Sequence, residues 1–264
     1  MKKIIACFFL LVLGLSARAQ VEVGGRASAG IDYKIVKGLH VSLEEEVRAG
    51  SNFSSLGSLR TTVGVDYKPV KYFKVGVGYT MINPYKASKS RFDDIRHRFM
   101  VDVTGYLPLG NFQISLKERL QLTHRTGSFN YYQTTPNALA LKSRLMVKYK
   151  GWEFVKPSLG FEIRTALNDP NGTYQTAEDE EGNTYYKYIH KAYNQVYNNR
   201  YRIILNADIK LSKHHTLTPS VLVDYNHEYE IDTTSPYTEP VKFKSAGYNN
   251  YWSIIPCLSY TFSF

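Results

Sequence analysis

The last fourteen residues, 251–264, place the tightest limit on what this chain can fold into. Every second side chain there is large and apolar, and this face carries Trp252, Tyr260, Phe262 and Phe264. The other face is small and mostly polar, and a period of two with one apolar face predicts a half-buried β-strand. As the closing strand of an outer-membrane barrel, its apolar face would meet lipid and its aromatic rings would lie at the membrane interface. We therefore expect this segment to close such a barrel and to act in its insertion.

The first nineteen residues have the order of a secretory signal peptide. Two lysines precede the apolar run 4–15, and an A-x-A cleavage site ends at Ala19. Twelve apolar residues are too few for a membrane-spanning helix, which needs about 20. We expect a signal peptide over 1–19 and a single barrel domain over 20–264 that has left the cytoplasm.

The charge of the chain argues against nucleic acid as a partner. Loss of the three cations of the signal peptide lowers the formal net charge from +10 to +7. The remaining charges recur along one face of the predicted strands and form no cluster, and the chain is secreted. Beyond residue 20 no apolar run reaches helical spanning length. Only Cys257 remains among the cysteines, so no internal disulfide forms.

Alternation of apolar and polar residues recurs throughout the mature chain. It defines eleven segments: 21–36, 41–49, 59–67, 73–81, 95–107, 112–122, 139–149, 155–164, 202–211, 220–228 and 251–264. Short turns at 37–38, 69–71, 108–111, 150–151 and 213–215 alternate with longer polar connections near 51–55, 83–93, 127–136, 168–195 and 231–247. Short periplasmic turns and long extracellular loops are typical of outer-membrane barrels. The fold class predicted is all-β, a transmembrane antiparallel β-barrel.

The strand number leaves alternatives open. With eleven strands, the first and last segments would run in the same direction, whereas bacterial single-chain barrels have even numbers of strands. Either a strand is hidden in 168–195 or 231–247, or the first segment splits at Gly24–Gly25 or does not join the wall. We expect ten to twelve strands and favour twelve.

Several short motifs resemble one family. The segments 38–46, 66–73 and 96–99, together with the aromatic end, resemble the DUF2490 family of bacterial outer-membrane proteins over most of the mature chain. The resemblance implies a barrel in the outer membrane of a Gram-negative bacterium and offers no catalytic residues to carry over. In that location, the partners expected are outer-membrane lipid, lipopolysaccharide and, during biogenesis, the barrel-assembly machinery.

The face opposite the apolar one carries charges of both signs, which we expect to line the lumen. They are Glu44, Glu46, Arg60, Arg96, Arg98, Asp102, Lys117, Arg119, Arg144, Glu162, Arg164, Arg202, Asp208 and Asp224. Barrels of ten to twelve strands fall between a filled eight-stranded interior and a sixteen-stranded channel. Two interpretations follow: the charges pair across a nearly closed structural barrel, or they line a narrow passive pore whose basic excess favours anions or other small solutes.

An enzyme that modifies lipid A or phospholipid is the alternative from another class. Polar residues in the lipid-facing phase are Glu45, His97, Glu118, His124 and Ser143. We expect His97 opposite about Leu122, and Ser143 opposite about Leu120, four residues along the strand from His124. At about 3.3 Å per residue this separation exceeds the roughly 3 Å of a Ser–His general-base pair. The sequence predicts no catalytic residues.

The sequence also gives no reason to expect a metal or another cofactor. The acidic run 178–183 lacks the spacing of a calcium-binding loop. We interpret it as a solvated loop.

Overall fold

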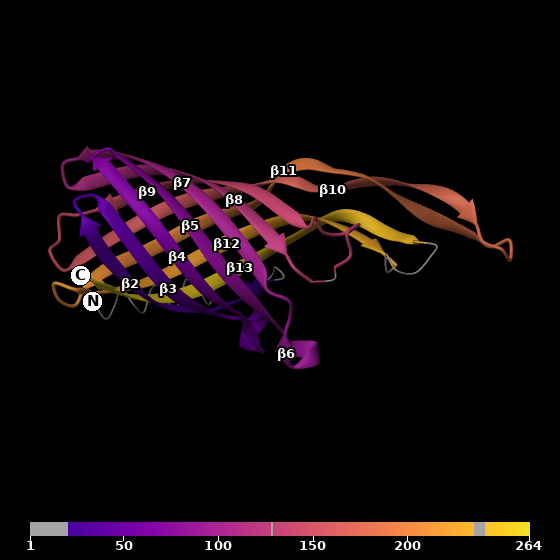
Figure 1. Ribbon diagram of the computed structural model, residues 1–264, viewed down its shortest axis with the longest axis horizontal. Coiled ribbons are helices and arrows are strands. Elements are labelled where there is room, and N and C mark those ends of the chain that lie inside the picture. Colours follow the sequence, from indigo (N-terminus) through magenta and orange to yellow (C-terminus); the bar gives the residue numbers. More distant parts are fainter. Residues whose placement is uncertain (1–20, 128, 235–240) are drawn as a thin grey trace.

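The alternating segments form strands that close on one another. The computed structural model describes residues 21–127, 129–234 and 241–264, so the predicted signal peptide lies outside the described residues. Within them, eleven long strands form a closed barrel whose neighbours are antiparallel except for the closing pair (Figure 1). They are β2 Arg26–Val36, β3 Leu39–Ala49, β4 Leu56–Val70, β5 Phe73–Lys86, β7 Arg96–Leu109, β8 Phe112–Arg125, β9 Asn137–Tyr149, β10 Val155–Glu178, β11 Thr184–Lys210, β12 His215–Thr233 and β13 Phe243–Ser263. The all-β barrel fold is thus confirmed.

Four short elements complete the part of the chain that the structure describes. Strand β1, Val21–Val23, lies beside β13, and strand β6, Arg91–Phe92, pairs with β5. Two 3-10 turns, η2 Ser51–Phe53 and η3 Ala87–Lys89, lie in the connections after β3 and β5. In the described ranges no helix is long and apolar enough to cross a membrane.

The barrel closes with a parallel pair. Residues 26–32 of β2 lie beside residues 257–263 of β13, in register and in the same direction. The first predicted segment splits at Gly24–Gly25, one of the alternatives given above, and β1 continues along β13 beside residues 252–254. The wall of the described chain therefore has eleven strands, within the expected range of ten to twelve. Twelve were favoured because the edge strands were expected to pair antiparallel, and parallel pairing removes that need.

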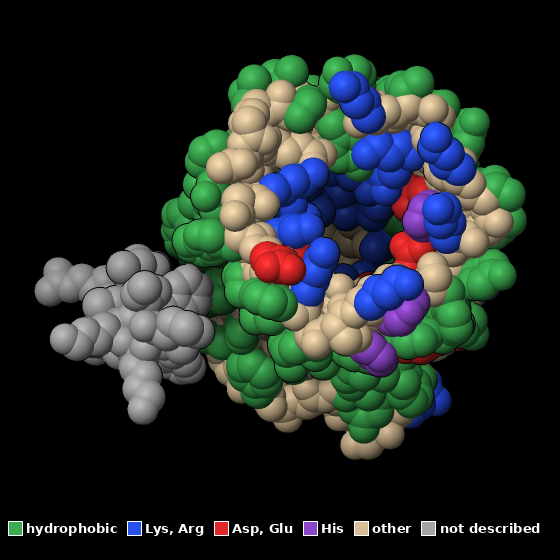
Figure 2. Space-filling model, turned by 90° about the vertical axis from the view of Figure 1, so that its left-hand side faces the viewer, with side chains coloured by type: hydrophobic (Ala, Val, Ile, Leu, Met, Phe, Trp, Pro, Cys, Tyr) green, Lys and Arg blue, Asp and Glu red, His purple; other side chains and the backbone are tan. Residues whose placement is uncertain are grey.

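The burial pattern is the reverse of that in a water-soluble protein. Along β7, Val101 and Val103 are 54% and 43% exposed, whereas Asp102 between them is 7% exposed. Successive side chains of a strand point to opposite faces, so apolar residues cover the outside and charges fill the lumen. Figure 2 shows this arrangement from the end of the barrel where the short turns lie, with hydrophobic side chains around a hollow lined by Lys and Arg.

The two ends of the barrel differ. Short turns gather at one end, here called the turn end, and the longer connections gather at the other, the loop end (Figure 1). At the loop end β10 and β11 pair with each other up to Glu178 and Thr184, beyond their last contacts with the neighbouring strands. The segment 168–195 is therefore mostly a projecting β-hairpin and not a loop, and 231–247 is also partly strand. A buried cluster of Tyr188, Ile231 and Val241 joins the two hairpins.

Candidate functional site: the barrel lumen

Strand pleating determines which side chains reach the lumen. Ten of the fourteen predicted lumen residues line cavities inside the described barrel: Glu44, Glu46, Arg60, Arg98, Lys117, Arg119, Arg144, Arg164, Arg202 and Asp208. Three more, Asp102, Glu162 and Asp224, form ion pairs with members of that set. The remaining residue, Arg96, starts β7 at the loop end.

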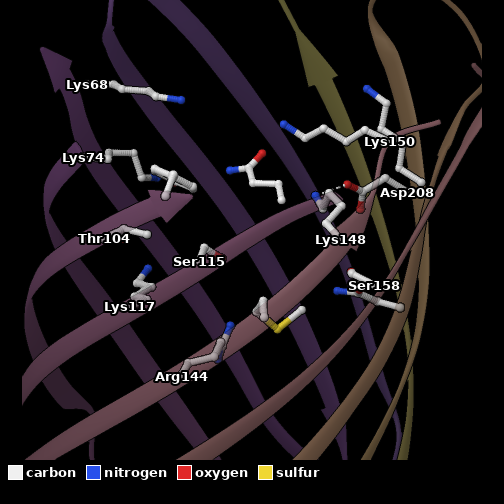
Figure 3. A pocket seen from close by; sticks show the side chains of 15 residues that line it. Lys68, Lys74, Thr104, Ser115, Lys117, Arg144, Lys148, Lys150, Ser158 and Asp208 are labelled. Atoms are coloured by element: carbon white, nitrogen blue, oxygen red, sulfur yellow. Dashed lines mark hydrogen bonds and ion pairs between the residues drawn. The ribbon is translucent and has the colours of Figure 1, made fainter. Parts of the chain in front are cut away.

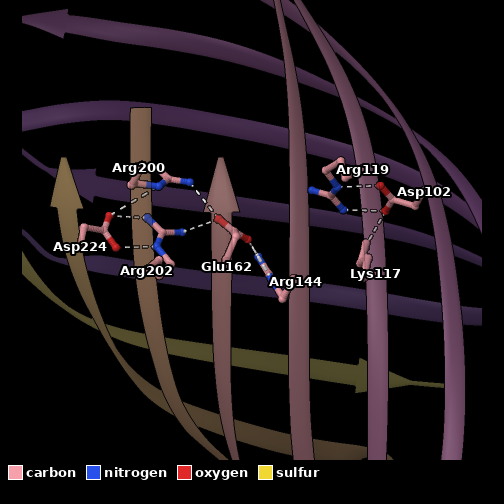
Figure 4. A network of polar contacts seen from close by, with 8 residues as sticks. All are labelled: Asp102, Lys117, Arg119, Arg144, Glu162, Arg200, Arg202 and Asp224. Atoms are coloured by element: carbon pink, nitrogen blue, oxygen red, sulfur yellow. Dashed lines mark hydrogen bonds and ion pairs between the residues drawn. The ribbon is translucent and has the colours of Figure 1, made fainter. Parts of the chain in front are cut away.

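A chain of ion pairs crosses four strands inside the wall (Figure 4). Glu162 on β10 lies opposite Arg144 and Arg202 on the neighbouring strands, and Arg202 lies opposite Asp224. The Arg202 guanidinium donates two hydrogen bonds of 2.6 Å to the Asp224 carboxylate. Arg144 Nε and Arg200 Nη2 donate to Glu162 at 2.8 and 2.9 Å. Glu162 is 1% exposed, and the positive charges of these guanidiniums and of the nearby Lys142 stabilise its buried carboxylate.

A second group centres on Asp102 (Figure 4). Arg119, its cross-strand partner, donates two hydrogen bonds of 2.7 Å, and Lys117 Nζ lies 2.6 Å from the same carboxylate. This bidentate geometry fixes the Arg119 side chain against the wall. The two groups therefore hold the lumen side chains in defined positions.

The middle of the lumen contains a cavity of about 400 Å³ with an excess of positive charge. Among the described residues its lining has eight cations, Arg26, Arg48, Arg60, Arg98, Arg119, Lys142, Arg144 and Arg202, and three carboxylates, Asp32, Glu44 and Glu46. Carboxylates behind the lining pair with Arg119, Arg144 and Arg202. In the described part of the chain Arg26, Arg98 and Lys142 make no ion pair. Unpaired charges in an apolar medium are costly, so this cavity calls for water or anions.

Cavities at the two ends have opposite charge. The turn-end cavity, about 470 Å³, shares Arg144 with the mid-lumen cavity. The loop-end cavity, about 610 Å³, has the cations Arg125 and Arg164 and the carboxylates Asp169, Glu228, Glu230 and Asp232 in its described lining. No described residue lines both this cavity and the mid-lumen cavity.

The turn-end lysines are the main group that sequence reasoning missed. Charges were expected to be scattered along the strands, but Lys68, Lys74, Lys148, Lys150 and Lys156 converge on one cavity. Lysines flank four of the five short turns in the sequence: Lys34 and Lys37, Lys68 to Lys74, Lys148 to Lys156, and Lys210 with Lys213. Because all short turns lie at one end, this recurrence could have indicated the basic mouth.

On the outer face of the described barrel, Ser143 forms no pair with His97 or His124. His97 lies opposite His124, and Ser143 lies opposite Glu118, each pairing shifted by two residues from the expected register. On the neighbouring strand β9, the residue opposite His124 is Asn137. Asn137 lies six residues before Ser143, so His124 and Ser143 are about 20 Å apart. The Ser143 hydroxyl instead donates to Glu118 at 2.6 Å.

Glu45 is an outward carboxylate that is satisfied in the same way. The Thr61 hydroxyl on β4 donates to Glu45 Oε2 at 3.0 Å. A hydroxyl from the adjacent strand thus lowers the cost of each carboxylate on an apolar surface.

The aromatic residues of the closing strand pack on the outer face. Trp252 contacts Tyr225 of β12 with ring centroids 5.1 Å apart, and Tyr260 contacts His215 at 5.9 Å. Phe262 packs edge-on against Phe264, whose backbone N–H donates to Asp32 O at 3.0 Å. The exposed fraction is 43% for Trp252 and 61% for Phe264, so both rings lie open on the outside of the barrel.

Comparison with known proteins identifies a family for this chain but indicates no function. The model of DUF2490, described as a protein of unknown function, matches residues 27–234. No curated protein matches the chain.

Proposed function

The chain belongs to the DUF2490 family, and we propose that it is an integral barrel of a Gram-negative outer membrane that forms a narrow, passive, anion-favouring pore. Two features support the location: the exposed apolar outer wall and the aromatic closing strand. Tilted strands with an apolar band outside and a polar interior are the arrangement that a bilayer stabilises. Outer-membrane lipid and lipopolysaccharide then surround the wall, and the barrel-assembly machinery inserts it.

The difference between the two ends gives the orientation. Short turns face the periplasm in bacterial outer-membrane barrels, and long connections face outward. The turn end with its lysines would therefore open on the periplasm, and the β10–β11 hairpin would project from the cell.

The charge of the mid-lumen cavity is the observation that favours a pore over a closed structural barrel. Eight cations and three carboxylates line it among the described residues, and Arg26, Arg98 and Lys142 make no ion pair there. A lumen filled by complementary pairs would be nearly neutral, whereas uncompensated cations are stabilised by water and counter-ions. Such a lumen admits small anions in preference to cations. The small volumes of the lumen cavities, about 400 to 610 Å³, predict a small conductance.

Planar-bilayer recording of the purified protein tests this function. We expect small discrete conductance steps and, under a KCl gradient, a reversal potential of the sign given by chloride selectivity. The double variant Arg98→Gln/Lys142→Gln should reduce that selectivity, because it removes two unpaired cations from the cavity. Lys191→Gln, an exposed change on the projecting hairpin, serves as the matched control. Absence of discrete conductance would disprove the pore, and selectivity for potassium would disprove its preference for anions.

Enzymatic modification of lipid A or phospholipid has no support in the geometry of Ser143 and His124. Mass spectra of both lipid classes from a deletion strain discriminate between the two functions. A mass difference that complementation restores would favour the enzyme.

A further inference from the structure

The turn-end cavity is enclosed by cations from five strands and one turn (Figure 3). Its described lining contains seven basic side chains, Lys68, Lys74, Lys117, Arg144, Lys148, Lys150 and Lys156, and a single carboxylate, Asp208. We call this cavity the lysine vestibule. At about 470 Å³ it has the size of a pocket for a small ligand.

Carboxylates neutralise only part of this charge. Four of the seven basic side chains have a carboxylate partner. The pairs are Lys74–Asp66 at 3.0 Å, Lys117–Asp102 at 2.6 Å, Lys148–Asp208 at 2.6 Å and Arg144–Glu162 at 2.5 Å. Within residues 21–127, 129–234 and 241–264, by contrast, Lys68, Lys150 and Lys156 make no ion pair, and Lys68 lies over the Tyr106 ring at 4.6 Å. Three ammonium groups therefore remain available to a ligand.

The lysines are close enough to repel one another. Burial lowers the pKa of Lys150, which lies in the turn after β9, and the positive charges of Lys148, Lys156 and Lys68 lower it further. Bound negative charge would relieve this repulsion.

A buried hydroxyl without a partner also belongs to the lining. Thr104 is 4% exposed, and its Oγ1 has no hydrogen-bond partner among the described residues. Thr104 lies between Lys74 and Lys117 in the strand register, opposite both. Buried hydroxyls are usually hydrogen-bonded, so this donor calls for an acceptor supplied from outside the chain.

From these observations we infer that the lysine vestibule binds a small soluble anion with two or more phosphate groups. Each phosphate carries about 1.5 to 2 negative charges at neutral pH, so two of them match the three free ammonium groups. Their oxygens also supply acceptors for the Thr104 hydroxyl and the lysine ammoniums. Lipid headgroups are a less suitable source because the lysines point into the lumen, and the wall separates them from the apolar outer face (Figure 3). The inference rests on the proposed function only in that the vestibule opens on the periplasm.

Calorimetric titration of the purified full barrel with pyrophosphate tests this site. We expect binding in a zwitterionic detergent at low salt that weakens as salt is raised, and at least tenfold weaker binding of citrate. The triple variant Lys68→Gln/Lys150→Gln/Lys156→Gln should weaken pyrophosphate binding at least tenfold. Thr104→Val should weaken it several-fold, whereas Thr104→Ser should retain it because the hydroxyl is kept.

Several outcomes would overturn the site. They are no pyrophosphate binding to the folded wild type, equal binding of citrate, or unchanged affinity in the triple variant. Lys191→Gln is the matched control for charge, and circular dichroism with a heat-modifiability gel verifies that each variant is folded. Loss of pyrophosphate binding in nanodiscs of phosphatidylglycerol, but not of phosphatidylcholine, would identify a lipid headgroup as the occupant and would also contradict the inference.

The binding measurement is independent of the pore. It needs neither a voltage nor a continuous passage, so a barrel without conductance that still binds pyrophosphate would disprove the pore and keep the site. A barrel that conducts but does not bind pyrophosphate would disprove the site and keep the pore.

Discussion

Inside this lumen, single carboxylates each hold several basic side chains in place. Glu162 is 1% exposed and accepts hydrogen bonds from Arg144 and Arg200, with Arg202 at 3.7 Å. Sharing one carboxylate among three guanidiniums is stable only while that charge is present. Asp102 has the same role for Lys117 and Arg119.

Replacement of Glu162 should therefore cost more than its size suggests. We expect Glu162→Gln to lower the free energy of unfolding by about 3–5 kcal/mol, because Arg144 loses its ion-pair partner and Arg200 and Arg202 are left to share Asp224. Urea unfolding in lipid, followed by tryptophan fluorescence, measures the change. Glu180→Gln, in the exposed turn of the projecting hairpin, should stay within about 0.5 kcal/mol of the wild type. Similar stability of the two variants would disprove the ion-pair role.

At the scale of elements, the alternation of apolar and polar residues predicted the strands and most of the turns. It could not predict the β10–β11 hairpin, because residues 169–195 leave the wall and no longer have one outer face and one lumen face. That segment is rich in tyrosine and threonine, which favour strands without alternation. The alternation also could not predict that the closing strands pair in parallel, because it indicates which face of a strand a side chain lies on but not which strand is the partner.

The parallel seam between β2 and β13 has a direct chemical test. Arg26 lies opposite Cys257 and Asp32 lies opposite Ser263, six residues further along. With Cys7→Ser removing the other cysteine, Arg26→Cys should form a disulfide with Cys257 under mild oxidation, because paired strand positions lie within disulfide reach. Asp32→Cys should stay reduced, since about 20 Å separates it from Cys257. Thiol titration reads both variants, and free thiols in Arg26→Cys would contradict eleven-strand parallel closure.

For the whole molecule, the sequence predicted the barrel and the charged lumen face, but not how charge is distributed along the axis. That distribution depends on which turns lie at the same end of the barrel and on how the strands tilt. Residues far apart in sequence therefore come to the same level along the barrel axis only when the barrel has closed. Lys68, Lys117 and Lys150 illustrate this, because they belong to three different hairpins and line one vestibule. The resulting gradient, basic at the turn end and acidic at the loop end, is a property of the closed cylinder alone.

The central claim is that the apolar phase of each strand faces acyl chains and the polar phase faces water in the lumen. Spin labels placed singly at Leu116, Lys117, Leu120 and Gln121 of β8, in a Cys7→Ser/Cys257→Ser background and a reconstituted bilayer, test it most directly. We predict high accessibility to oxygen and low accessibility to a polar nickel reagent at Leu116 and Leu120, which are 51% and 44% exposed. The opposite should hold at Lys117 and Gln121, which line lumen cavities. Equal access of the polar reagent to all four labels would contradict the account.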